Sequence, residues 1–528
     1  MKLARSLAPW LAVVAVVGLV LPADEASAQK RGGTLVMLVQ PEPPTLASYI
    51  STSGPIGQVT SKIFEGLLEY DWSLKPVPGL AESWKVSPDG KTITFTLQKG
   101  VKFHDGKPFT SADVKFSILE VLKKMHPRGP ATFREVTEID TPDAHTVIFR
   151  LAGPAPYLLM ALSGYESPML PKHLYEGTDI KASKYGNAPV GTGPFKFVEW
   201  QRGQFIRLDR NPDYWKPGRP YLDGIEYTII ADRSTRMLSF ASGKFDMTFP
   251  TDLTVPLYKN MMRDAPHVKC TMRDTGVSTN LIVNRESPPF DDPKIRRALA
   301  LTLDRQAFID ILSEGEGKMS GAMLPPPSGV WGMPPEMLKT IIGYDNVPAN
   351  REKARELMKE AGYGPDKRLK VKVSTRNIAT FRDPATILID HLKHIYVDGE
   401  LEVIDTSVYY NRVFKKDYAV ALNLTGSAVD DPDVTFFEGY ACGSLRNYNN
   451  YCNPEMTKLF AAQSREIDHE KRLKMVWDID RKLQEDIARP IIAQGRAAGC
   501  WQPYVKGVVL HSNSIYNGAR FEDVWLDK

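Results

Sequence analysis

The chain has 528 residues, and its 67 basic and 63 acidic side chains give a formal net charge of +4. This near balance excludes the strongly basic surface of a nucleic-acid-binding protein, so no nucleic-acid partner is expected. The length exceeds what one hydrophobic core usually supports, which predicts two lobes or more.

Residues 1–28 are predicted to be a secretory signal peptide. Lys2 and Arg5 precede an apolar run over 7–21, and Ala26-Ser27-Ala28 has the small-x-small pattern of a cleavage site. The run is shorter than the about 20 residues that cross a bilayer. No cysteine stands beside the cleavage site, so no lipid anchor is expected there. These features predict a soluble periplasmic protein that begins at Gln29.

The first half of the mature chain predicts mostly strands. Residues 33–40 read as a buried strand and residues 57–70 as a helix, which is the opening of an α/β lobe. A helix is expected to start at Ser111, with Ala112 and Asp113 in its first turn. Further strands are predicted at 91–97, 146–151, 195–200, 205–208, 225–230 and 280–283.

The second half predicts longer helices that alternate with strands. Asn350 is expected to cap a helix that carries an apolar stripe and ends at Gly362. Strands at 370–374, 400–405 and 418–424 surround a helix at 384–396, and another helix covers 469–488. This β-α-β order favours a parallel sheet in a second lobe.

Four cysteines occur in the chain, and two of them are predicted to pair. Cys442 and Cys452 lie in the loop-like segment CGSLRNYNNYC, and disulfides persist in the periplasm. Such a bridge would stabilise the fold by roughly 3 kcal/mol in the chain-entropy model. The alternative is two separate thiols. A second bridge between Cys270 and Cys500 stays open, because four cysteines allow three connectivities.

The motifs of common enzymes are absent from the sequence. There is no GxxxxGK[ST] loop, HExxH, CxxC or GxSxG, so no catalytic residue and no cofactor are predicted. His104-Asp105-Gly106 reads as a turn between a strand and a helix. His391 and His394 could share a helix face, but they lack supporting ligands, so no metal site is predicted.

Several segments resemble one family of binding proteins in the same order along the chain. They are LAESWKVSPDGKTITFTLQKGVKFHDGKPFTSADVKFSI (80–118), PVGTGPFKFVEW (189–200), RNPDYWKPGRPYLDGIEY (210–227), PFDDPKIRRALALTLDR (289–305), NREKARELMKEAGY (350–363) and NPEMTKLF (453–460). They are similar to the extracellular solute-binding proteins of family 5, which serve ABC importers of peptides and nickel.

The resemblance implies an α/β periplasmic-binding-protein fold, class II-like, with two lobes, a hinge and an extra small domain in the first lobe. Lobe 1 would comprise 29–76, 190–283 and 502–528, the extra small domain 77–189, and lobe 2 residues 284–501. Crossings between the lobes would form the hinge.

The implied protein is a non-enzymatic monomer that closes its lobes around a small organic ligand and delivers it to ABC permease subunits in the inner membrane. Peptides, opine-like compounds, glycosides and aromatic acids all stay open as ligand classes. The alternative is a periplasmic sensor or chaperone-like binding protein of the same fold. A secreted hydrolase is disfavoured because nucleophile and metal motifs are missing.

The ligand's amino anchor is where the sequence departs from peptide-binding relatives. In those relatives an aspartate in the loop after a strand anchors the peptide's amino terminus, and Ser427 or Ala428 stands at that place here. The departure puts ordinary peptide binding in doubt. A shift of two or three residues in the alignment would restore the role to Asp430 or Asp431, although Asp431-Pro432 could also form a simple turn.

Other ligand contacts are predicted on both lobes. Arg376 or Arg382 could bind a ligand carboxylate, unless they are ordinary surface arginines. The loop of Ser51, Thr52, Ser53 and Gly54 corresponds to a loop near the ligand in dipeptide-binding relatives.

Polar aromatic residues concentrate near the expected ligand side of the second lobe. They could stack on an organic ligand or pack around the Cys442–Cys452 bridge. The residues predicted to contact the ligand are Tyr409, Arg446 and Tyr448.

Overall fold

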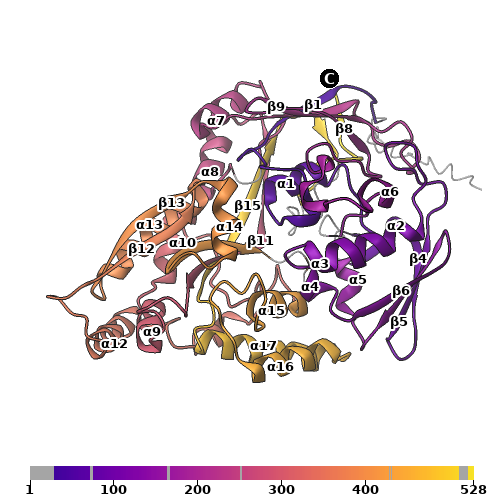
Figure 1. Ribbon diagram of the computed structural model, residues 1–528. Helices are drawn as coiled ribbons and strands as arrows, with labels where there is room; N and C mark the ends of the chain where they lie inside the picture. Colours follow the sequence, from indigo (N-terminus) through magenta and orange to yellow (C-terminus); the bar gives the residue numbers. More distant parts are fainter. Residues whose placement is uncertain are drawn as a thin grey trace, which may run out of the picture.

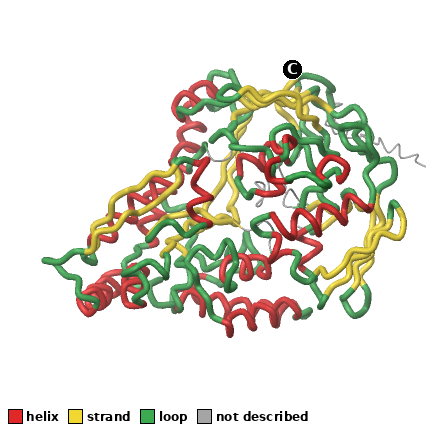
Figure 2. Tube along the Cα trace, in the orientation of Figure 1, coloured by secondary structure: helices red, strands yellow, loops and turns green. Residues whose placement is uncertain are grey.

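The structure is a computed structural model that describes residues 29–71, 75–162, 167–249, 252–426, 429, 431–510 and 521–528. The predicted signal peptide, residues 1–28, lies outside them and stays a prediction. The described chain is an α/β molecule with helices packed around several sheets (Figures 1 and 2).

Sheet 1 has the strand order β1-β10-β9-β8. Its strands are β1 (Thr34–Leu38), β8 (Phe195–Gln201), β9 (Phe205–Arg210) and β10 (Gly224–Thr228). β1 runs parallel to β10, and the other pairs are antiparallel. The sheet forms the yellow group at the top of Figure 2.

The helix predicted over 57–70 is wrong at both ends. α1 covers Gly54–Thr60, and β2 (Leu68–Tyr70) is a strand that pairs with β3 (Pro76–Pro78). Backbone pairing with a segment several residues further along the chain overrides the helical spacing of the apolar residues here. Three short 3₁₀ helices occur among the described residues, one before α1 and two just before β8. They are η1 (Ser48–Ile50), η3 (Ile180–Ala182) and η4 (Lys184–Gly186).

Sheet 2 is antiparallel and has the order β4-β5-β7-β6. Its strands are β4 (Ala81–Val86), β5 (Thr92–Leu97), β6 (Val136–Asp143) and β7 (Thr146–Leu151). The neighbouring helices are α2 (Ser111–Lys115), π-helical η2 (Phe116–Leu122), α3 (Lys123–Met125), α4 (Gly129–Thr132), α5 (Tyr157–Ala161) and α6 (Lys172–Tyr175). α2 starts at Ser111 as predicted, with a capping box between Thr110 and Asp113. Sheets 1 and 2 share one hydrophobic core.

Sheet 3 has the order β13-β12-β14-β11-β15. Its strands are β11 (Lys269–Val283), β12 (Leu369–Arg376), β13 (Val397–Ile404), β14 (Val420–Gly426) and β15 (Ile491–Trp501). β12 is parallel to β13 and β14, as the β-α-β order predicted, whereas β11 is antiparallel to β14 and β15.

Helices surround sheet 3. α9 (Pro293–Leu301), α10 (Arg305–Ser313), α12 (Val347–Glu360) and α13 (Ala379–Lys393) contribute to a second core on one face, and α14 (Thr406–Phe414) contributes Tyr409 to a cluster on the other. The remaining elements are α7 (Arg233–Ala241), α8 (Val255–Asp264), α11 (Pro335–Leu338), α15 (Pro432–Tyr440), α16 (Pro454–Arg465), α17 (His469–Glu485), β16 (Val505–Lys506) and β17 (Trp525–Leu526).

The cap predicted for α12 is wrong. Asn346, and not Asn350, caps the helix, because its side chain accepts a hydrogen bond from the backbone N–H of Ala349 at 3.3 Å. Asn350 lies inside the helix and donates its side-chain amide to the backbone of Asp345.

Two long strands join the parts of the molecule. Lys269–Asp274 of β11 pairs with Arg496–Trp501 of β15, and Trp501 connects through a bridge at Met247 to β1. The other end of β11 belongs to sheet 3. We name the part built on sheets 1 and 2 lobe 1, the part built on sheet 3 lobe 2, and β11 with β15 the crossing strands. The residue boundaries predicted for the lobes stay a prediction.

The structure contains two disulfides, the predicted one and the one that the sequence left open. Cys442–Cys452 closes the predicted loop, which confirms that pairing. Cys270–Cys500, which the sequence left open, joins residues that face each other across β11 and β15. This second bridge therefore ties the crossing strands together at their lobe 1 end.

Candidate ligand site between the lobes

One face of sheet 3 carries polar side chains toward lobe 1. Ser374 of β12 pairs with Ala421 of β14, and Asn280 of β11 pairs with Asn423 of β14. Because side chains alternate along a strand, Arg376, Asn423 and Asn280 lie on the same face. We name it the site face. The opposite face packs into the second core.

Arg376 is a buried cation at the end of β12. The residue is 3% exposed, its Nε donates to Oγ1 of Thr406 at 3.1 Å, and its Nη2 donates to Oγ of Ser53 in lobe 1 at 3.5 Å. Among the described residues it forms no ion pair with a carboxylate, and burial lowers the pKa of its guanidinium. A buried guanidinium with neutral partners strongly favours binding an anion.

Arg446 also reaches across to lobe 1, but its charge is balanced. Its Nη1 donates to Oγ1 of Thr52 at 2.6 Å, and its Nε pairs with Glu438. Glu438 also forms an ion pair with Arg128 of lobe 1, at 2.8 Å. Arg128 in turn donates a hydrogen bond to the carbonyl of Gly426 at 2.8 Å. A buried carboxylate thus joins two arginines, one from each lobe.

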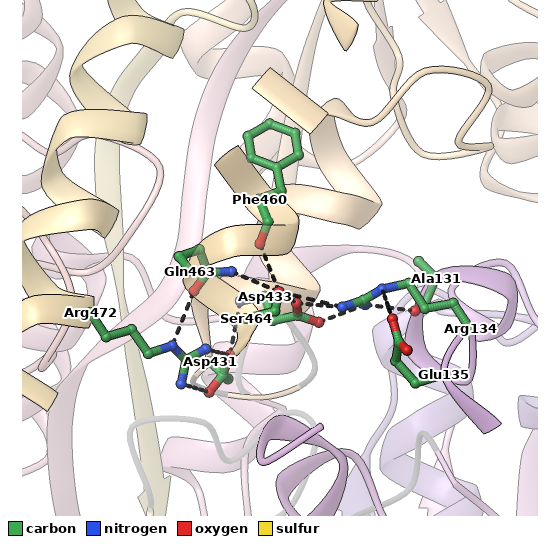
Figure 3. Close-up of polar contacts among 9 residues, drawn as sticks. All are labelled: Ala131, Arg134, Glu135, Asp431, Asp433, Phe460, Gln463, Ser464 and Arg472. Atoms are coloured by element: carbon green, nitrogen blue, oxygen red, sulfur yellow. Dashed lines mark hydrogen bonds and ion pairs between the residues drawn. The ribbon is translucent and has the colours of Figure 1, made fainter. Parts of the chain in front are cut away.

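A second network joins the lobes at the start of α15 (Figure 3). Arg134, from lobe 1, donates to both carboxylate oxygens of Asp433 at 2.7 Å. Arg472 donates to both oxygens of Asp431, at 3.0 and 2.6 Å, and receives support from Gln463. Both aspartates therefore have bidentate arginine partners, and both lobes are in contact.

Other buried polar atoms of this region have no hydrogen-bond partner among the described residues. Asn423 is 1% exposed, yet neither atom of its amide is hydrogen-bonded to a described residue, and the same holds for the hydroxyls of Tyr409 and Tyr448. Burial raises the pKa of Tyr448 to about 12, so its hydroxyl keeps its proton and can donate. An unpaired buried group costs about 1–3 kcal/mol, which a polar ligand could offset.

A match to one protein-family model shows which family the chain belongs to. The model of bacterial extracellular solute-binding proteins, family 5 Middle, matches residues 75–446. The chain belongs to this family. As a family 5 protein it is the substrate-binding component of an ABC importer and a binding protein, not an enzyme.

Relatives and solved structures agree with this. The di/tripeptide-binding protein 1 of Pseudomonas aeruginosa is 28% identical over 84% of this chain and 85% of its own. The DppA protein of Helicobacter pylori, solved with the peptide STSA, has a TM-score of 0.83 and 24% identity, over 94% and 99% of the two chains. AgaA of A. tumefacien R10, solved with agropinic acid, has a TM-score of 0.79 and 27% identity over the same shares. The α/β periplasmic-binding-protein fold is thereby confirmed.

The family 5 structure brings together part of the predicted ligand residues. Thr52 and Ser53 of lobe 1 meet Arg446 and Arg376 of lobe 2. Ser51 accepts the backbone N–H of Ser53, and Gly54 begins α1. Tyr448 lies 5.8 Å from the Arg446 guanidinium, ring centroid to Cζ.

Other predicted residues lie elsewhere. Arg382 is exposed at the start of α13, unlike the buried Arg376. Asp431 is held by Arg472 inside lobe 2, so the geometry favours the structural role that the sequence left open for it. Ser427, Ala428 and Asp430 lie outside the described residues, and their predicted ligand contacts stay predictions.

The sequence interpretation missed the polar residues inside the strands and the arginines of lobe 1. Asn280 and Asn423 interrupt the apolar runs STNLIV and VALNLTG, and such an interruption is a readable signal for a buried polar site. Arg128 and Arg134 have no comparable signal, because their partners lie about 300 residues further along the chain.

The described residues contain neither a long apolar helix nor a cluster of metal-ligating side chains. No helix among them combines the length and the apolar character that crossing a bilayer requires. Nor do the described residues place three or more His, Cys, Asp or Glu side chains together as a metal site would need. His391 packs edge-on against Phe308, with ring centroids 5.0 Å apart.

Proposed function

We propose that this family 5 protein binds a small organic acid between its lobes and holds the acid's anionic group on Arg376. Arg376 carries the proposal, because it is buried at the lobe contact and has neutral partners. A ligand carboxylate could accept hydrogen bonds from the planar guanidinium of Arg376, while Ser53 and Thr406 keep this guanidinium oriented.

Relatives support two chemical classes of acid. The similar proteins named above bind di- and tripeptides, the peptide STSA and agropinic acid. A peptide ends in a carboxylate, and agropinic acid is an acid by name. We therefore place peptide-like and opine-like acids ahead of glycosides as ligands, and aromatic acids remain compatible with Arg376.

The wider role follows from the family and from the predicted signal peptide. The mature protein would work as a periplasmic monomer, close its lobes on the ligand and present both lobes to permease subunits in the inner membrane. The ligand would act by favouring the closed state of an equilibrium between open and closed lobes. The lobe contacts made by Arg376 and Arg446 are those expected of the closed state.

Native mass spectrometry and mutation test the proposal. Protein lacking residues 1–28 is purified without denaturant, and any small molecule that it releases is identified. We expect an organic acid. Isothermal titration should then show that Arg376→Ala weakens its binding about 10- to 150-fold, the equivalent of a charge-assisted hydrogen bond.

Arg382→Ala is the matched control, because it removes a nearby arginine that is exposed. It should leave affinity unchanged. A neutral solute, or equal affinities of the Arg376→Ala and Arg382→Ala variants, would overturn the role of Arg376.

A further inference from the structure

A cavity of about 180 Å³ lies behind the crossing strands. We propose that this hinge cavity is a second binding site, which takes a neutral molecule of one six-membered ring and thereby favours the closed lobes. Its walls are Leu253, Val255, Phe308, Leu312, Leu424 and Ile492, with further residues of β11 and β15.

The hinge cavity lies on the opposite side of sheet 3 from the proposed ligand site. Thr279 and Leu424 are cross-strand partners and both line the cavity. The next pair along the strands, Asn280 and Asn423, belongs to the site face, and side chains alternate between faces. A molecule in the hinge cavity therefore cannot occupy the Arg376 site.

Both lobes contribute walls to the hinge cavity. Leu253 belongs to the core of lobe 1 and precedes α8, whereas Phe308 of α10 and Ile492 of β15 belong to the core of lobe 2. In Figure 1, α8, α10 and α13 lie to the left of β11 and β15, and α1 lies to their right. The cavity thus sits where the two cores meet along the crossing strands.

The size of the hinge cavity limits its occupant. Ligand pockets for drug-sized molecules measure about 300–1,000 Å³, which is more than this cavity offers. An apolar cavity of about 150 Å³ in another protein binds benzene. A single ring with one small substituent therefore matches the available space.

The lining decides the occupant's polarity. Most of the walls are aliphatic or aromatic, and the two charged residues, Asp383 and Arg496, have opposite signs. Arg496 is already paired with Asp274 at 3.2 Å. Thr380 also lines the cavity, and its hydroxyl is buried with no hydrogen-bond partner among the described residues. A neutral ring with one hydroxyl group, such as phenol, suits these walls.

Occupancy of the hinge cavity would couple to closure, a step that rests on the proposed function. A rotation about β11 and β15 that opens the site face brings the walls behind the strands closer together. The cavity is therefore widest when the lobes are closed, and an occupant that needs this width binds the closed state better. Such a difference in affinity is what shifts a conformational equilibrium.

The first experiment measures binding of phenol to the mature chain by ligand-observed NMR, with no other ligand present. Leu312→Trp should fill the cavity and abolish the phenol signal. Ile311→Trp is the matched control, because Ile311 is the neighbouring residue of α10 and is 61% exposed. Val255→Phe fills the cavity from the lobe 1 wall and replaces Leu312→Trp if that variant does not fold.

Phenol binding that is absent from the wild type, or equal in the filled and control variants, would overturn the site. Arg376→Ala should keep phenol binding. If this variant no longer binds the organic acid but still binds phenol, the two sites are separate. Failure of one proposal then does not affect the other.

The second experiment measures closure by small-angle X-ray scattering. Phenol should lower the mean radius of gyration of the wild-type protein and leave that of Leu312→Trp unchanged. Binding of phenol without any change in the radius of gyration would refute the coupling.

Discussion

Asn423 is a buried strand residue whose amide is expected to serve ligand binding rather than stability. Its amide lies in the middle of the site face with no partner among the described residues, whereas its cross-strand neighbour Asn280 donates to Oγ1 of Thr425 at 2.8 Å. The two asparagines are equivalent in burial and in strand position. They differ in whether another described residue forms a hydrogen bond with the side-chain amide.

This difference predicts opposite effects of the same substitution. Asn423→Leu should raise the free energy of unfolding of the ligand-free protein by about 1–3 kcal/mol, because it removes a buried amide that no described residue satisfies. It should also weaken binding of the organic acid. Urea unfolding and isothermal titration measure the two effects.

Asn280→Leu is the matched control for Asn423→Leu. It should lower the free energy of unfolding, because it breaks hydrogen bonds and leaves Thr425 without its donor. If both variants are destabilised alike, Asn423 is no ligand contact.

At the scale of elements, the sequence predicted most of the strands and failed where pairing between segments overrides the local pattern. β5 and β7 could be read directly, since each alternates fully buried residues with less buried ones. The segment 68–70 could not, because its strand character comes from pairing with β3. In the same way Arg376 was found as a polar residue after a strand, while Arg128 needed the contact with Glu438. Local pattern predicts an element, but tertiary contacts decide its partners.

The two disulfides give a prediction at this scale. In the chain-entropy model a bridge stabilises more when it closes a longer loop. Cys442–Cys452 spans 10 residues and Cys270–Cys500 spans 230. Replacing both cysteines of the first pair by alanine should therefore cost about 3 kcal/mol, and of the second about 5 kcal/mol, in free energy of unfolding.

Urea unfolding of the two double variants checks this order. Equal losses of unfolding free energy would mean that the segments of β11 and β15 stay in contact in the unfolded chain and already restrict it. A larger loss for Cys442 and Cys452 would show that their loop depends on its bridge for structure.

At the scale of the whole molecule, arginines of both lobes make contacts that stabilise the closed arrangement. Arg128 and Arg134 reach from lobe 1 to Glu438 and Asp433, and Arg446 reaches back from lobe 2 to Thr52. These contacts do not involve Arg376, so they would remain when the organic acid is absent. The lobes should therefore spend part of their time closed without ligand.

The Arg134–Asp433 pair allows a direct test, since a similar pair lies beside it within one lobe (Figure 3). Asp433→Asn should weaken a contact that crosses between lobes and increase the mean radius of gyration of the ligand-free protein in small-angle X-ray scattering. Asp431→Asn weakens the pair with Arg472, and both of its members belong to lobe 2. It should lower the free energy of unfolding, because it leaves a buried cation poorly compensated, without changing the radius of gyration. If both variants expand the protein alike, the ion pairs support the fold of lobe 2 and closure depends on the ligand.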